Sequence, residues 1–188
     1  RSTASSNPHD ICTLNPYIDP LLVSVRGAIV PDRGYPCRLA RMPSMRSRFW
    51  ADPLFFAALA AALVYWLVLY LATQAVPEPG WPLREPLRFL YPALLYPVVE
   101  ELVFRGLVQD LAHRHLSPWR LGPLSHANLL TSLLFTALHF INHAPLWAAA
   151  VFFPSLVFGF FKDRTGKLAA PIILHVFYNS GYFWLFGQ

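Results

Sequence analysis

Five apolar segments follow one another along the last three-quarters of the chain, and polar stretches separate them. The first is uncharged and long enough to cross a bilayer as a helix, since about 20 apolar residues span the hydrocarbon core; the last three are shorter. The pattern predicts an all-α, polytopic transmembrane helical bundle with about five spans. The segments are residues 54–76, 88–111, 126–141, 146–161 and 168–186.

Composition agrees with a membrane protein. Hydrophobic residues make up 55 % of the 188 residues and charged residues only 13 %, about half the usual share of a soluble domain. This excludes a disordered chain and a solvated helical bundle. The net charge of +5 is typical of basic cytoplasmic loops and predicts no nucleic-acid partner. Cys12 and Cys37 are too few for a four-cysteine metal site.

Residues 1–48 differ from the rest, being polar and rich in proline and serine, without the pattern of a signal peptide. They predict a poorly ordered N-terminal extension, either a leader or sequence foreign to the domain, with Met42 or Met45 as a natural start. The alternative is a short cytoplasmic extension that folds on the domain. Residues 49–188 form the predicted transmembrane domain.

Basic residues gather before the first span, between the second and third spans, and between the fourth and fifth spans. With five spans these three regions lie on the same side of the membrane, and the positive-inside rule makes that side cytoplasmic and the C-terminus external. The residues concerned are Arg38, Arg41, Arg46, Arg48, Arg114, Arg120, Lys162, Arg164 and Lys167.

The second span contains three charged residues, which cost too much free energy to face lipid. Glu101 and Arg105 lie four residues apart and can pair on one helix face. Glu100 lies about 100° around the helix and points elsewhere, free for proton chemistry. A structural salt-bridge cluster is the alternative interpretation.

Polar residues also interrupt two later spans. His139 lies in the final turns of the third span, one turn after Phe135, and His175 and Asn179 share a face of the fifth. Taken singly, each fits a packing histidine or an interhelical hydrogen bond. Straight helices would put His139 and His175 at different depths, so their meeting needs a tilt, or a kink at a residue such as Pro171.

Taken together, these groups are the parts of a hydrolase that activates water. Glu100 suits a general base, His139 can orient water or carry a proton, and the remaining pair can donate to an oxyanion. No serine or cysteine nucleophile lies beside an obvious base.

The signatures Glu100-Glu101-x-x-x-Arg105, Phe135-x-x-x-His139 and His175-x-x-x-Asn179, in this order, resemble those of the CAAX-protease and bacteriocin-processing family. These glutamic intramembrane proteases are also called the abortive-infection family. The resemblance covers residues 88–186 and implies a four-helix catalytic core with a water-filled cavity.

By this resemblance, Glu100 activates water with help from His139, His175 and Asn179 form the oxyanion site, and Glu101, Arg105 and Phe135 support it. The implied substrate is a membrane-associated protein or peptide, such as one with a C-terminal sorting signal or a bacteriocin-like peptide. The implied location is the lipid bilayer of a bacterial inner membrane.

Two other functions stay open from the residues alone. A metal-dependent membrane hydrolase could use the same carboxylate, imidazole and amide groups as ligands, although the His-Glu-x-x-His pattern of zinc proteases is missing. A non-enzymatic membrane binding or immunity protein could keep the cluster for structure. The leading prediction is an endopeptidase without metal or cofactor.

Overall fold

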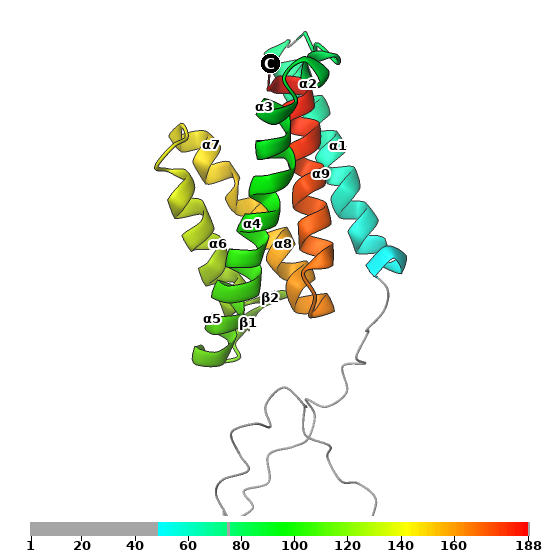
Figure 1. The fold of residues 1–188 in the computed structure, drawn as a ribbon. Coiled ribbons are helices and arrows are strands. Elements are labelled where there is room, and N and C mark those ends of the chain that lie inside the picture. Colours follow the sequence, from blue (N-terminus) through cyan, green and yellow to red (C-terminus); the bar gives the residue numbers. More distant parts are fainter. Residues whose placement is uncertain (1–48, 75, 188) are drawn as a thin grey trace, which may run out of the picture. The chain divides into compact units, whose positions relative to one another are not determined.

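The computed structural model describes residues 49–74 and 76–187, which are mostly helical (Figure 1). The predicted N-terminal extension lies outside the described residues. The elements, in chain order, are η1 (Phe49–Ala51), α1 (Pro53–Thr73), α2 (Trp81–Arg84), α3 (Pro86–Leu90), η2 (Tyr91–Leu95), α4 (Tyr96–Val103), η3 (Phe104–Val108), α5 (Gln109–His115), β1 (Arg120–Leu121), β2 (Leu124–Ser125), α6 (His126–His139), α7 (Pro145–Ala150), α8 (Phe152–Thr165) and α9 (Ala169–Phe186).

Helices occupy each of the five apolar segments. Two helical stretches in the described part are long and apolar enough to cross a membrane, Pro53–Thr73 and Pro145–Thr165. The second of these comprises α7 and α8, which are separated at Val151. The count of five spans stays a prediction.

The second apolar segment is helical from α3 through α5, with two π-helical turns, η2 and η3. In η2 the amide of Tyr96 donates to the carbonyl of Tyr91, five residues back. Pro97, which would donate next in this register, has no N–H. The carbonyl of Pro92 is therefore left for a donor from another element.

Helix α9 is central to the packing: it contacts α1, α4 and α8, while α6 packs on α8 (Figure 1). Two glycines allow the closest approaches. A Cβ added at Gly159 of α8 would lie 1.9 Å from Oδ1 of Asn128, and one added at Gly181 of α9 would lie 2.2 Å from the ring of Trp66. Larger residues at either position would force neighbouring helices apart.

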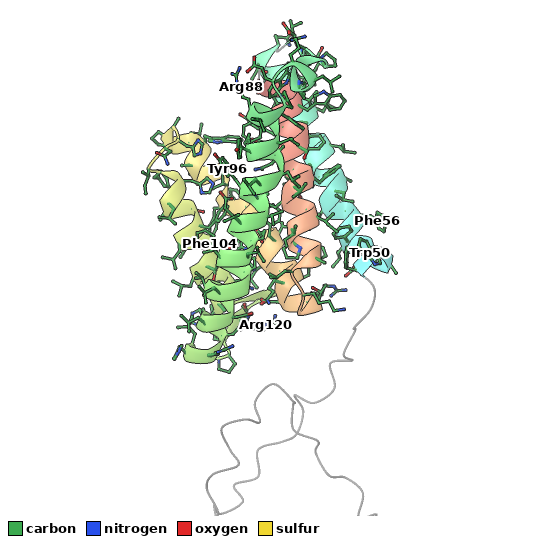
Figure 2. All side chains as sticks on the ribbon, in the orientation of Figure 1. Trp50, Phe56, Arg88, Tyr96, Phe104 and Arg120 are labelled. Atoms are coloured by element: carbon green, nitrogen blue, oxygen red, sulfur yellow. The ribbon has the colours of Figure 1, made fainter. Side chains whose placement is uncertain are left out.

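Helix α1 buries only a narrow stripe, formed by Phe55, Ala58 and Ala62. Most of its other large apolar side chains are exposed, and Figure 2 shows Phe56 on the side facing away from the other helices. A helix that leaves so much apolar surface uncovered by protein is typical of one that faces lipid.

Asp52 fixes the start of α1 and ties it to α8. Its Oδ1 accepts a hydrogen bond from the amide of Leu54 at 3.0 Å, and Oδ2 forms an ion pair with Arg164. We expect Asp52→Ala to lower the free energy of unfolding by about 1–2 kcal/mol, because both the cap and the pair are lost. Asp52→Asn keeps the cap and should lose less. Thermal unfolding in detergent measures both, and equal stability of wild type and the alanine variant would contradict this role.

Candidate active site

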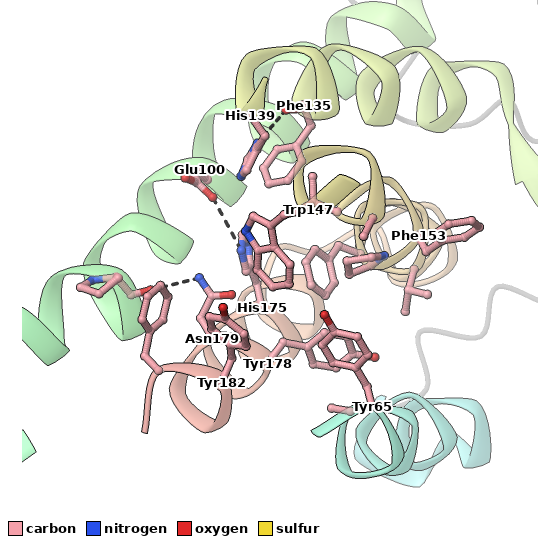
Figure 3. Close-up of a pocket in the computed structure, with 18 of the residues that line it drawn as sticks. Tyr65, Glu100, Phe135, His139, Trp147, Phe153, His175, Tyr178, Asn179 and Tyr182 are labelled. Carbon is pink, nitrogen blue, oxygen red and sulfur yellow. Dashed lines mark hydrogen bonds and ion pairs between the residues drawn. The ribbon is translucent and has the colours of Figure 1, made fainter. Parts of the chain in front are cut away.

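A cavity of about 560 Å³ lies among α1, α4, α6, α7, α8 and α9, and apolar or aromatic side chains form most of its wall. Four of its few polar groups are the side chains predicted to be catalytic, and Figure 3 shows them converging from three helices. These are Glu100 of α4, His139 of α6, and His175 and Asn179 of α9.

His175 lies between two carboxylates. Its Nδ1 is 2.9 Å from Oε1 of Glu101, and its Nε2 is 3.6 Å from Oε2 of Glu100 (Figure 3 shows the second contact). The two glutamates leave α4 in different directions, as predicted, but reach opposite edges of one imidazole. Glu101 is fully buried, whereas the Glu100 side chain is 31 % exposed. Only Glu100 lines the cavity.

The predicted pair of Glu101 and Arg105 is present, with Nε of the arginine 3.2 Å from Oε2 of the glutamate. Both side chains are buried. Arg105 also donates from Nη2 to Oγ and the carbonyl of Ser155 in α8, at 2.7 and 3.0 Å. In an ion pair with this guanidinium the Glu101 carboxylate can only accept, so Nδ1 of His175 donates to it. The other nitrogen, Nε2, then faces Glu100.

His139 has a defined orientation and tautomer. Its Nδ1 lies 2.8 Å from the carbonyl oxygen of Phe135, and a carbonyl can only accept, so Nδ1 carries a hydrogen. In the neutral ring Nε2 is then free to accept a proton. The ring of Phe135 lies 4.4 Å from that of His139 and also covers the guanidinium of Arg105, at 5.6 Å. Phe135 thus joins the two polar groups by packing.

Asn179 is held by the π-helical turn. Its Nδ2 donates to the carbonyl of Pro92 at 3.0 Å, the group that Pro97 leaves without a helical donor. One amide hydrogen is therefore committed, and the second amide hydrogen and Oδ1 remain for a ligand.

The depth difference expected for the two histidines does not separate them. His139 is the last residue of α6, which ends well below the far end of α9 in Figure 1, and His175 lies in the second turn of α9. Both side chains line the same cavity, so the expected difference in depth does not keep them apart.

Several lining residues were not predicted. His143, in the turn after α6, lines the cavity and stacks on His139 with ring centres 5.6 Å apart. Its four-residue spacing from His139 was the available signal. Trp147 of α7 stacks on Tyr182 of α9 at 4.8 Å. Tyr65 of α1 also lines the cavity.

In the described part of the chain, no group of three or more His, Cys, Asp or Glu side chains has the arrangement of a metal site.

The chain was compared with models of known protein families. The model of a family described as type II CAAX prenyl endopeptidase Rce1-like matches residues 82–181, which include all three signatures. No curated protein and no solved structure matches the chain.

Proposed function

This chain belongs to the type II CAAX prenyl endopeptidase Rce1-like family, and on that premise we propose that it is an intramembrane endopeptidase of the glutamic type. The family is one of membrane-embedded proteases, so the reaction class is peptide-bond hydrolysis. The observation that carries the finer proposal is the convergence of Glu100, His139, His175 and Asn179 on one largely apolar cavity.

Water activation falls to Glu100 and His139. A water molecule between them gives a proton to the Glu100 carboxylate while its oxygen attacks the carbonyl carbon of the scissile bond. His139 supports this step because its bond to the Phe135 carbonyl leaves Nε2 as an acceptor that can orient the water. An apolar cavity wall strengthens these interactions by keeping bulk water away.

His175 and Asn179 stabilise the oxyanion that forms in this attack. The second amide hydrogen of Asn179 is available for it, and Nε2 of His175 donates when it carries a proton. Collapse of the tetrahedral intermediate breaks the carbon–nitrogen bond, and the amine leaves with the proton that Glu100 took from water. The products are a new carboxyl group and a new amine.

Glu101, Arg105 and Phe135 are positioning residues in this proposal. Glu101 holds Nδ1 of His175, Arg105 holds Glu101, and Phe135 packs on His139. A buried carboxylate on Nδ1 orients the imidazole and stabilises its doubly protonated form, in which Nε2 can donate to the oxyanion.

The proposed substrate is a membrane-associated protein or peptide, with a C-terminal sorting signal or a bacteriocin-like peptide as the narrower candidates. The proposed location is a bacterial inner membrane, crossed by about five spans of which four form the catalytic core. Support comes from the apolar surface of α1 and the loop charges.

Metal removal separates this mechanism from a metal-dependent one. We expect the purified protein to cleave membrane peptides at an unchanged rate after dialysis against EDTA or 1,10-phenanthroline, because side chains supply both base and oxyanion donors. Rates are measured by mass spectrometry of the new peptide ends. Loss of activity that is restored by a divalent ion would support the metal-dependent alternative.

The non-enzymatic alternative is tested in cells. Membrane peptides from a host with the wild-type gene are compared with those from a host with the His139→Gln gene, at equal protein levels. A peptide end present only with wild type supports the enzyme; identical peptide sets would support a binding or immunity role.

A further inference from the structure

The imidazole of His175 packs against an aromatic ring of α8 that belongs to none of the three signatures. The ring of Phe158 lies 4.7 Å from that of His175, centre to centre, and the two planes differ by only 23°. Phe158 is 2 % exposed and lines the cavity. Phe135 also touches this imidazole, but at 5.9 Å and 70°. Phe158 is thus the ring that lies nearly parallel to the histidine and presents its face to it.

Polar contacts on both sides of Phe158 fix the turns of α8 that carry it. Before it, Oγ of Ser155 accepts a hydrogen bond from Nη2 of Arg105 at 2.7 Å. After it, the carbonyl of Gly159 accepts one from Nε2 of Gln109 at 3.0 Å. Ser155, Arg105 and Gln109 are fully buried, where such bonds are not exchanged for bonds to water. The aromatic ring therefore has a defined place beneath the histidine.

The surroundings of His175 favour a positive charge on its ring. Glu101 accepts from Nδ1 at 2.9 Å, and Glu100 lies 3.6 Å from Nε2. His139 shares the cavity and brings no negative charge. Both nitrogen edges are therefore occupied by α4, and the ring face is where Phe158 acts. The face of an aromatic ring is electron-rich and attracts a cation within about 6 Å, most strongly where water is excluded.

Stabilisation through the face differs in kind from stabilisation by a carboxylate. A further carboxylate near Nε2 would accept its hydrogen and compete with the substrate for it. A ring beneath the imidazole stabilises the same charge and leaves the hydrogen of Nε2 free to donate. An aliphatic side chain at this position would fill the space without contributing this attraction.

We propose that Phe158 is a positioning residue that holds the plane of His175 and stabilises its doubly protonated form, the form in which Nε2 donates to the oxyanion. The inference rests on the proposed endopeptidase function and adds to it a residue of α8, outside the three signatures. Phe158 acts through His175 and takes no part in bond breaking.

The test weakens the ring face while nearly keeping the shape of the side chain. Monofluoro-, difluoro- and trifluorophenylalanine are placed at position 158 of the full chain by nonsense suppression, since fluorine withdraws electron density from the face. We expect kcat for a detergent-solubilised membrane peptide to fall stepwise, by about tenfold with three fluorines, the loss of a desolvated cation–π contact. KM and the melting temperature should stay at their wild-type values, because the contact gains strength only as the oxyanion forms. Phe158→Leu should lose about as much in kcat and also melt at a lower temperature.

Phe161 is the matched control, because it lies on the same helix, is 1 % exposed and packs against Phe55 at 5.6 Å without lining the cavity. Trifluorophenylalanine at position 161 should leave kcat unchanged, and Phe161→Leu should lower the melting temperature alone. A constant kcat across the Phe158 series, a change confined to KM, or the same loss at position 161 would overturn the inference while leaving the endopeptidase in place. If wild type cleaves no membrane peptide, the proposed function fails and this inference fails with it.

Discussion

Glu100→Gln is expected to lower kcat/KM for peptide cleavage by about 10²–10⁴-fold, the usual contribution of a general base. The amide has nearly the same volume as the carboxylate but cannot accept the proton of the attacking water. Glu100 also lies 3.6 Å from Nε2 of His175 without being fully buried, so its replacement should leave the packing intact. Initial rates on a detergent-solubilised peptide measure the loss.

Glu85→Gln is the matched control for this variant. Glu85 is exposed and pairs with Arg88 at 3.1 Å, away from the cavity, and exposed pairs contribute little to stability. Its activity should equal that of wild type. If Glu100→Gln cleaves the peptide at the wild-type rate, Glu100 is not the base and the glutamic mechanism fails.

Arg105→Met should lower the free energy of unfolding by about 3–5 kcal/mol, the usual cost of removing one partner of a buried ion pair. The substitution leaves the Glu101 carboxylate buried beside an apolar side chain and removes the hydrogen bonds to Ser155. The melting temperature in detergent reports the change.

A double variant and a control separate the effect of the buried charge from the effect of lost packing. Glu101→Gln combined with Arg105→Met removes the uncompensated charge and should recover part of the lost stability, although His175 then loses its ionised partner. Arg88→Met, at an exposed arginine, should change the melting temperature little. A single Arg105→Met variant as stable as wild type would show that the pair does not support the fold.

The helical segments were predictable because a bilayer-spanning helix leaves a long apolar run. The breaks and irregular turns within these helical segments could not be predicted in the same way. The division of the fourth segment at Val151 and the π-helical turns η2 and η3 depend on local hydrogen-bond register, which leaves no period in the hydrophobic pattern. Pro92 and Pro97 are visible in the sequence at η2, but their presence alone does not give the π-helical form of this turn.

The candidate site was predictable where polar residues interrupt apolar helices, since lipid makes each of them expensive. That argument brought out Glu100, His139, His175 and Asn179. It could not bring out Trp147, because an apolar residue that lines a cavity looks the same in a sequence as one that faces lipid. His143 was missed because it lies in the turn after α6, although its four-residue spacing from His139 is that of a helix face.

The missing N–H of Pro97 matters for any attempt to build this site into another protein. The amide of Asn179 is kept in place by a backbone oxygen that is vacant only because a proline stands five positions further along. If only the polar side chains were transplanted onto another helical bundle, a backbone N–H of the host helix would donate to the carbonyl at the position of Pro92. The asparagine would then lose the acceptor that orients it. A transplanted site should therefore include Pro97 together with the polar side chains.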